Sequence, residues 1–307
     1  MINDSIFQDF IYRYRSFNSH SIDALKNDRL YFSTPSYFND PFDSVIYIDE
    51  ERLLHSILRD MDNGMASYLD SIADTDGTLV TSDNKNQVLT LTQNTDFRLL
   101  QLKRVSKIIN DTQEKLLSNS KAICFSEDPL SMLMWSHYAD YHKGFVLAYR
   151  KSELPHAKCY DVNGIEHSTI LKLGKIRYRD QMPDFGEFFY DYLPKKVKGF
   201  PPSLYTRFLL QMIFNKTIAW NYEKEWRLCS IPEDYSNENP VSYASIRPYC
   251  IFLGAKMPAK QKWELFCIAK KMDIAVFEVW ANNRSADFKL NFQGVNSREL
   301  KQEANEY

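Results

Sequence analysis

Hydrophobic and polar positions alternate along the first part of this 307-residue chain. Residues 9–15 (DFIYRYR) have the period of two that is typical of a strand, which places Tyr12 and Tyr14 on one face and Arg13 and Arg15 on the other. Two arginines on one strand face are costly to bury without an anionic partner. The pattern therefore predicts either an anion-binding face or a solvent-exposed edge strand.

The rest of the chain reads as a mixture of helices and strands. Apolar periodicity predicts helices at 21–29 (capped by Ser19 or Ser21), 97–117, 129–140, 203–220 and 258–271. Apolar runs predict strands at 30–32, 122–126, 144–150, 247–256 and 274–281. Because these elements do not alternate strictly, we expect an α+β fold with a mainly antiparallel sheet flanked by helices.

The domain organisation follows from the same pattern. No repeat or long low-complexity linker divides the sequence, which predicts a single catalytic-type domain over residues 1–307. A helical insertion is expected at about 50–118 and a polar tail at about 291–307. The polar run at 74–86 is expected to be a mobile loop.

Composition narrows the classes of protein. A hydrophobic content of 44% with 25% charged residues is ordinary for a soluble globular chain. No apolar run approaches the ~20 residues that span a bilayer, and the N-terminus lacks the basic region of a secretory signal. We therefore expect a cytoplasmic protein with no membrane partner. The five scattered cysteines include no CxxC pair, so neither a disulfide framework nor a metal site is expected.

Charge is distributed unevenly. The net charge is −2, but residues 1–100 carry a balance of −8 and residues 171–230 a balance of +5. The basic part, with Lys172, Lys175, Arg177, Arg179, Lys195, Lys196 and Lys198, suits a dinucleotide or nucleic acid, although a solvated lysine-rich face is the alternative. The nine glycines form neither a GxGxxG nor a GxxxxGK[ST] motif, which excludes the glycine-rich nucleotide loops.

The strongest candidate site lies in 221–230 (NYEKEWRLCS), where a helix is expected to run into a strand. Glu223 and Glu225 are two residues apart, so on a strand both carboxylates face the same side. Arg227 continues that face. The alternative is a surface ion-pair ladder, which would explain all three residues without any site.

Aromatic residues accompany these charges. The loop within 30–44 carries rings at positions 31, 32, 37, 38 and 42, an apolar area that must pack on the core or on a planar ligand. Trp135 and Tyr138 are three residues apart on the helix predicted at 129–140, which gives that helix an aromatic face.

Several motifs together resemble a bacterial family, domain of unknown function 2971. They are YRYR, RLYFSTPSYFNDPFD, ICFSEDP, MWSHYADYHKGFVLAY, YEKEWR and FLGAKM, and they extend from about residue 11 to about residue 280. Their order, from a basic strand through an aromatic-serine loop and a Phe-Ser strand to a Glu-x-Glu strand, is also similar to the ADP-ribosyltransferase superfamily. That resemblance implies a split antiparallel sheet.

The superfamily resemblance also implies roles for individual residues. An early arginine grips NAD, a serine shapes the nicotinamide pocket and a late glutamate drives transfer. By position these roles fall on Arg15, on Ser126 or Ser33, and on Glu225 with Glu223 as the accessory acid. The middle motif departs from the Ser-Thr-Ser form, which leaves the role of the serine open. The other residues expected to bind the dinucleotide are Arg13, Tyr31, Tyr37, Asn39, Asp40, Trp135 and Tyr138.

The implied activity is ADP-ribosyl transfer that uses NAD as a substrate, with a nucleic-acid or protein acceptor. A toxin or antiphage role, with a partner protein or antitoxin, is implied by analogy. Two alternatives stay open. One is a nuclease or glycosidase in which Asp40, Glu127, Asp128 and Glu225 bind a divalent metal or perform acid–base chemistry. The other is a non-catalytic sensor whose arginines and aromatic residues hold a nucleotide.

Overall fold

The computed structural model describes residues 8–60, 90, 94–186, 190, 202–231, 239–282, 286 and 288–305. Contacts divide the chain into two compact units. The first comprises Met1–Asp43, Ser118–Asp180 and Ile213–Tyr307, and the second comprises Ser44–Leu117 and Gln181–Met212. The loop predicted at 74–86 and the basic residues Lys195, Lys196 and Lys198 lie outside the described residues.

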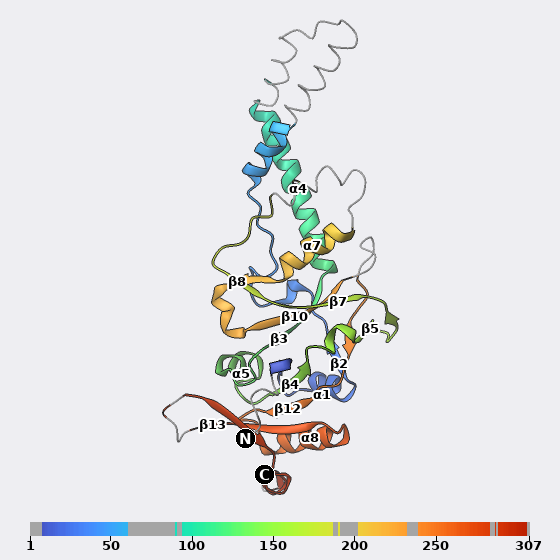
Figure 1. Ribbon diagram of the computed structural model, residues 1–307, viewed down its shortest axis with the longest axis vertical. Helices are drawn as coiled ribbons and strands as arrows, with labels where there is room; N and C mark the ends of the chain where they lie inside the picture. Colours follow the sequence, from blue (N-terminus) through green and yellow to red (C-terminus); the bar gives the residue numbers. More distant parts are fainter. Residues whose placement is uncertain are drawn as a thin grey trace, which may run out of the picture. The chain divides into compact units, whose positions relative to one another are not determined.

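Within the described residues, the first unit is built on an eight-stranded sheet with the order β14-β13-β12-β4-β1-β3-β10-β7 (Figure 1). The strands are β1 (Phe10–Arg15), β3 (Lys121–Ser126), β4 (Phe145–Arg150), β7 (Ile170–Lys175), β10 (Glu225–Ile231), β12 (Cys250–Leu253), β13 (Ala275–Ala281) and β14 (Leu290–Gly294). Neighbouring strands are antiparallel except β12 and β13, which are parallel. The predicted α+β fold with a mainly antiparallel sheet is confirmed.

Smaller elements surround this sheet. The first unit contains α1 (Ser19–Lys26), η2 (Pro35–Tyr37), α5 (Met132–Tyr138), η3 (Leu154–His156), η5 (Ile218–Glu223), α8 (Ala259–Lys271) and α9 (Ser297–Asn305). It also contains a small sheet of β2 (Arg29–Tyr31), β11 (Tyr243–Ser245), β5 (Lys158–Tyr160) and β6 (Glu166–His167), and the parallel pair of β8 (Arg177–Arg179) and β9 (Asn215–Thr217).

The second unit is mainly helical where it is described. It holds residues 50–60, most of α4 (Thr95–Asn119) and most of α7 (Pro202–Ile213). The hydroxyl of Ser106 on α4 donates to Glu50 Oε2 at 2.5 Å, which ties α4 to the helix at 50–60. Among the described helices, none is both long and apolar enough to cross a membrane.

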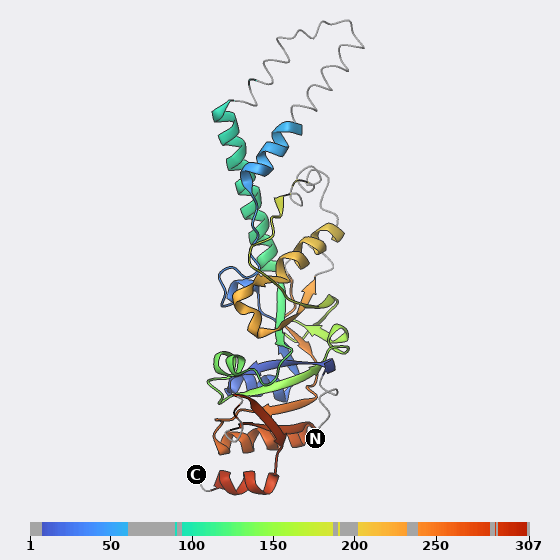
Figure 2. The same ribbon diagram turned by 60° about the vertical axis from the view of Figure 1, so that its left-hand side comes forward.

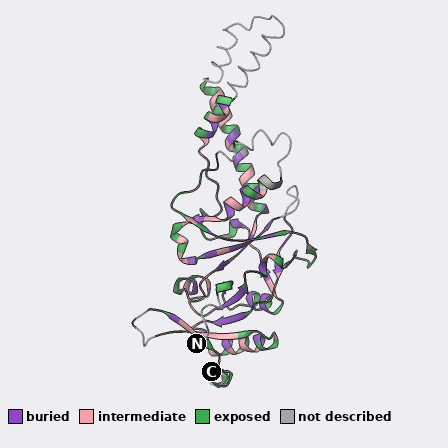
Figure 3. Ribbon diagram, viewed as in Figure 1, coloured by how far each residue is buried: buried purple, intermediate pink, exposed green. Residues whose placement is uncertain are grey.

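Strand alternation places a separate hydrophobic core on each face of the large sheet. Ile11 and Leu147 belong to one core, together with apolar residues of α1 and α8. Tyr12 and Val146 belong to the other, together with Trp135 of α5. Figure 2 shows α8 lying along β12 and β13, and Figure 3 shows the central strands largely buried. The period of two in the sequence therefore assigns the side chains of β1 to the correct faces of the sheet.

Four details differ from the sequence expectations. β1 lies between β4 and β3, so the alternative of an exposed edge strand is wrong. The N-cap of α1 is Asn18, whose side chain accepts from Ser21 N at 2.8 Å, and α5 starts after Ser131 rather than at the predicted proline. The single helix predicted at 203–220 is instead α7, β9 and η5, because β9 pairs with β8 and tertiary pairing overrides helix propensity.

Gly144 is required at the turn that leads into β4. A Cβ there would lie 2.1 Å from the backbone oxygen of Arg15 and 2.9 Å from that of Ala139, and backbone atoms cannot give way as a flexible side chain does. We expect Gly144→Ala to lower the free energy of unfolding by about 3 kcal/mol, the upper end of the usual cost of overpacking, as measured by urea denaturation. Gly294→Ala is the matched control, because a Cβ at Gly294 meets nothing within 4 Å. Equal stability of the two variants would contradict this account.

Candidate functional site

The large sheet is split between β1 and β3. In the described strands, β1 and β4 pair along the whole of Phe10–Arg15, whereas β1 and β3 share a single register pair, Tyr12 with Ser126. Beyond that pair, Arg13 Nη1 donates to the backbone oxygen of Cys124 at 2.5 Å. A side chain therefore replaces the backbone ladder at this point, and the strands separate.

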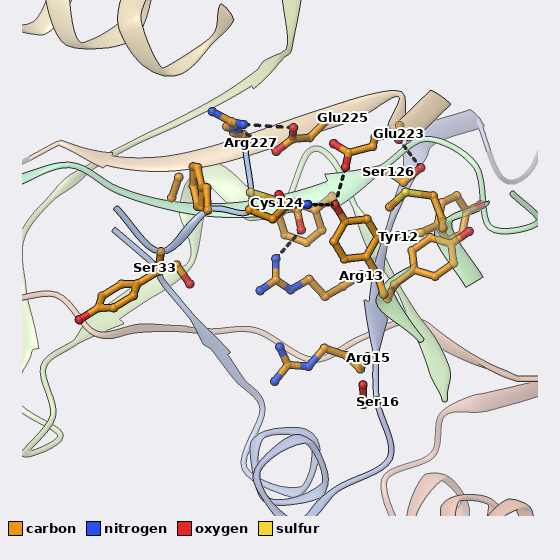
Figure 4. A pocket seen from close by; sticks show the side chains of 18 of the residues that line it. Tyr12, Arg13, Arg15, Ser16, Ser33, Cys124, Ser126, Glu223, Glu225 and Arg227 are labelled. Atoms are coloured by element: carbon orange, nitrogen blue, oxygen red, sulfur yellow. Dashed lines mark hydrogen bonds and ion pairs between the residues drawn. The ribbon is translucent and has the colours of Figure 1, made fainter. Parts of the chain in front are cut away.

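A cavity of about 440 Å³ opens at the split. This volume lies within the range typical of small-molecule sites. The predicted site residues that line it are Arg13, Arg15, Ser33, Tyr37, Asn39, Ser126, Tyr138, Glu223 and Glu225. Figure 4 shows the two arginines extending into a space that Ser33 borders on the other side, with both glutamates nearby. The structure thus brings most of the predicted residues together.

Three predicted residues do not line this cavity. Trp135 is 0% exposed, its ring lies edge-on to Tyr14 at 5.4 Å, and its Nε1 donates to a backbone oxygen at 2.8 Å. The expectation that Trp135 binds a ligand is therefore wrong. On the aromatic face of α5, Trp135 lies in the core and only Tyr138 lines the cavity. Asp40 is buried and accepts from Phe42 N at 2.9 Å, as in an Asx turn. Tyr31 packs instead against other rings, as described below.

Arg13 and Arg15 carry positive charge into the cavity. Among the described residues, neither guanidinium forms an ion pair with an aspartate or glutamate. Burial, reinforced by the charge of Arg13, lowers the pKa of Arg15 to about 10. Charged groups in this situation are stabilised by an anionic ligand. Both arginines of β1 therefore lie on the face that lines the cavity, and anion binding there stays a prediction.

A backbone turn, rather than strand alternation, brings the two glutamates together. Glu223 is the last residue of η5, Lys224 adopts a left-handed φ of 45°, and Glu225 is the first residue of β10. The expectation that both carboxylates lie on one strand face is therefore wrong, although they do meet. Ser126 Oγ donates to the backbone oxygen of Glu223 at 2.7 Å and so holds this junction in place. The serine positions a glutamate through its backbone.

Both carboxylates belong to a buried network of ion pairs. Arg227 Nε donates to Glu225 Oε1 at 2.8 Å, and the same guanidinium binds both oxygens of Asp43 at 2.8 and 2.5 Å. Lys216 Nζ donates to Glu223 at 2.6 Å and to Glu225 at 3.1 Å. Arg227 is 0% exposed. The predicted alternative of a surface ion-pair ladder is therefore wrong, because these ion pairs form but are buried inside the protein.

The network also holds the aromatic loop. Tyr138 OH donates to Glu223 Oε1 at 2.6 Å and accepts from Asn39 Nδ2 at 2.9 Å. Asp43, near the end of the same loop, is held by Arg227, whose guanidinium carbon lies 4.8 Å from the Phe38 ring. The loop is therefore fixed at two points to the residues that carry the carboxylates.

The two glutamates have different protonation behaviour. Burial acts to raise the pKa of Glu225, but the charges of Arg227 and Lys216 outweigh it and lower that pKa to about 2. For Glu223, burial together with the charge of Glu225 outweighs Lys216, and the pKa is raised. Such divergence is typical of carboxylate pairs with separate roles. The surroundings of Glu225 therefore favour its ionised form, whereas those of Glu223 favour protonation relative to a free glutamate.

Two members of the network, Lys216 and Asp43, were not predicted from the sequence. Lys216 falls in the stretch assigned to a helix, and a polar triplet, NKT, between apolar runs was the signal available there. Asp43 lies near the end of the aromatic loop, and nothing in the sequence indicated that it pairs with Arg227. The signal for Arg227 was clearer, because it lies two residues after Glu225 on the same strand face.

The metal-binding set proposed for a nuclease is not assembled. Glu127 accepts from Trp226 Nε1 at 2.7 Å and from Lys175 at 2.8 Å, while Asp128 pairs with Lys224 at 3.2 Å. Neither acid lines the cavity. In the part of the chain that the structure describes, no group of three His, Cys, Asp or Glu side chains is placed to hold a metal ion. The side chains required by that alternative therefore point to other partners.

The chain was compared with protein families, curated proteins and solved structures. A family model described as "Protein of unknown function (DUF2971)" matches residues 134–228. This stretch is about a third of the chain and includes Tyr138, Lys216, Glu223, Glu225 and Arg227, but not β1. Comparisons with curated proteins and with solved structures found no match. The resemblance noted over residues 11–280 is thus supported across 134–228.

Proposed function

We propose that this chain binds NAD in the cavity at the split and transfers ADP-ribose from it. The observation that carries the proposal is a cavity that contains two guanidiniums, neither paired with a carboxylate of the described residues, and two carboxylates of opposite pKa shift. Both features suit NAD. Its diphosphate is an anion that arginine binds through paired charge-assisted hydrogen bonds, and its cleavage develops positive charge on a ribose.

The chemistry assigns a separate part to each glutamate. When the bond between ribose C1′ and the nicotinamide nitrogen breaks, its electron pair leaves with neutral nicotinamide and the ribose becomes oxocarbenium-like. Glu225 stays ionised and is held in orientation by Arg227 and Lys216, so its carboxylate stabilises that charge without reorganising. As the acceptor oxygen or nitrogen bonds to C1′, Glu223 takes the acceptor proton, which suits its raised pKa.

A second candidate function is a non-catalytic nucleotide sensor. The observation that favours it is the full engagement of Glu225, whose two oxygens accept from Arg227 and Lys216. In that case Arg13 and Arg15 hold the nucleotide and the carboxylates only organise the aromatic loop. A role as a toxin or antiphage effector, with or without an antitoxin partner, belongs to the transferase proposal by analogy alone.

Incubation of the purified chain with NAD separates these functions. Release of nicotinamide together with transfer of labelled ADP-ribose supports the transferase. Binding of NAD by calorimetry without nicotinamide release supports the sensor. A chain that neither binds nor cleaves NAD overturns both.

Arg15→Ala should weaken NAD binding without weakening the fold. Removing a charge-assisted contact to the diphosphate is expected to raise the Kd for NAD by about tenfold or more. The free energy of unfolding should stay level or rise, because the partly buried guanidinium has no carboxylate partner among the described residues. Calorimetry and urea denaturation measure the two effects.

Arg247→Ala is the matched control for Arg15→Ala. Arg247 forms an exposed ion pair with Asp28 at 3.0 Å and does not line the cavity. Its replacement should leave the Kd for NAD unchanged. Unchanged affinity in Arg15→Ala as well would remove Arg15 from the site.

A further inference from the structure

The small sheet has one face in the core and the other open. The central residues of its first three strands, Leu30, Ala244 and Cys159, lie opposite one another and are buried. Strand alternation turns the flanking residues to the outer face. Register then gives two rows across β2, β11 and β5, which are Tyr31–Tyr243–Tyr160 and Arg29–Ser245–Lys158. Figure 1 shows β2 and β5 beside the large sheet.

The first of these, here called the tyrosine row, is a continuous aromatic surface. Ring centroids are 5.7 Å apart between Tyr31 and Tyr243, and 5.3 Å apart between Tyr243 and Tyr160. Each of the three tyrosines is partly exposed. One ring on each of three neighbouring strands is the arrangement by which sheet-surface aromatics stack successive unpaired bases.

The tyrosine row begins at the cavity. His20 lines the cavity, and its ring centroid lies 4.9 Å from that of Tyr31. A chain-like ligand stacked on the row would therefore have its end at the wall of the cavity. The position of Tyr31 outside the cavity, unexpected for a nicotinamide-binding residue, is explained if it belongs to this second surface.

Cations run beside the rings. Arg29 places its guanidinium carbon 5.0 Å above the Tyr243 ring, and Lys158 lies in the same row. Their present partners are exposed acids, Asp23 at 4.0 Å and Glu166 at 3.0 Å. Exposed pairs of this kind contribute little stability and can exchange for a phosphate. Rings and cations side by side are the combination that binds a single-stranded nucleic acid.

We propose that the tyrosine row binds single-stranded nucleic acid and delivers it to the cavity as the acceptor of ADP-ribose. That the bound strand accepts ADP-ribose rests on the proposed transferase function. The binding of the strand to this surface does not depend on it. A single strand fits better than a duplex because its bases are free to stack on side chains.

Fluorescence anisotropy with a labelled single strand tests the surface. The wild-type chain should bind short DNA or RNA single strands, with affinity falling as salt rises, and should bind the matching duplex more weakly. Tyr243→Ala should raise the Kd for the single strand by about tenfold or more, since one stacking platform is lost. Tyr243→Phe keeps the ring and should bind like the wild type.

Tyr249→Ala is the matched control, because Tyr249 is an exposed tyrosine that lies outside the small sheet and packs on Phe10 at 4.7 Å. It should bind like the wild type. Should Tyr243→Ala fail to fold by circular dichroism, Tyr160→Ala on β5 supplies the same test. A wild-type chain that ignores single strands, or folded alanine variants that bind them normally, would overturn the inference.

Parallel measurement of nicotinamide release keeps the two proposals distinct. Release from NAD with no oligonucleotide binding overturns the tyrosine row and leaves the transferase in place. Binding through the row without any NAD cleavage overturns the transferase and leaves the surface in place. Transfer of label to proteins but never to a bound single strand overturns the row as an acceptor site.

Discussion

Glu225→Gln is expected to lower the rate of nicotinamide release by about 100-fold or more, the size of effect seen when one preorganised electrostatic contact to a developing charge is removed. Glutamine has nearly the same shape but no charge, so it cannot stabilise an oxocarbenium-like ribose. NAD should still bind, because Arg13 and Arg15 are untouched. Single-turnover assays and calorimetry on the same preparation separate the two quantities.

The substitution should also weaken the fold, although it is nearly isosteric. Glu225 balances Arg227 and Lys216 inside the protein, and a neutral amide removes one of the carboxylates that these cations share with Asp43 and Glu223. A loss of about 1–3 kcal/mol is expected, as for other buried polar groups that lose a partner. Activity must therefore be compared at a temperature where both proteins are folded.

Glu127→Gln is the matched control for that experiment. Glu127 follows β3 directly and pairs with Lys175 near the surface, outside the cavity. Nicotinamide release should stay close to that of the wild type. A fully active, folded Glu225→Gln protein would remove Glu225 from the chemistry and favour the sensor.

Local patterns predicted most of the large sheet. The strands at 122–126, 144–150 and 274–281 appear within a residue or two of their predicted ends, because each is a run of apolar residues bounded by polar or turn residues. The strands of the small sheet and the β8–β9 pair are only two or three residues long, and among them only β2 was predicted, at 30–32. Apart from the local β5–β6 pair, they are formed by partners far apart in the chain, and a local window of sequence does not contain that tertiary pairing.

The sequence predicted which charged residues belong to the candidate site better than it predicted how they are arranged. Arg15 and Glu225 stand out because a charge on an otherwise apolar strand needs a partner. The turn at Lys224, which brings Glu223 into the cavity, depends on a left-handed backbone at a lysine and has no sequence signal. Lys216 and Asp43 become partners of the glutamates only through contacts across the fold.

Arg227→Met should be the most destabilising substitution in this network. Methionine keeps an unbranched apolar side chain but leaves Asp43 and Glu225 buried without their main cation, and breaking a buried pair in this way costs about 3–5 kcal/mol. Urea denaturation at neutral pH measures the loss. Arg247→Met, which breaks an exposed pair, is the control and should cost no more than about 1 kcal/mol.

The pH dependence of that loss identifies its cause. The pKa of Glu225 is held at about 2, below the ordinary value of 4.5, so its ionised form stabilises the wild type above pH 4.5 and this stabilisation is lost as the pH falls toward 2. In Arg227→Met, burial without the guanidinium favours the neutral form of Glu225. Protonation at low pH should therefore stabilise the variant, whereas it destabilises the wild type. The difference in stability between the two proteins should therefore shrink below pH 4.5. A difference that stays constant from pH 7 to pH 3 would mean that lost packing, rather than lost charge pairing, explains the effect.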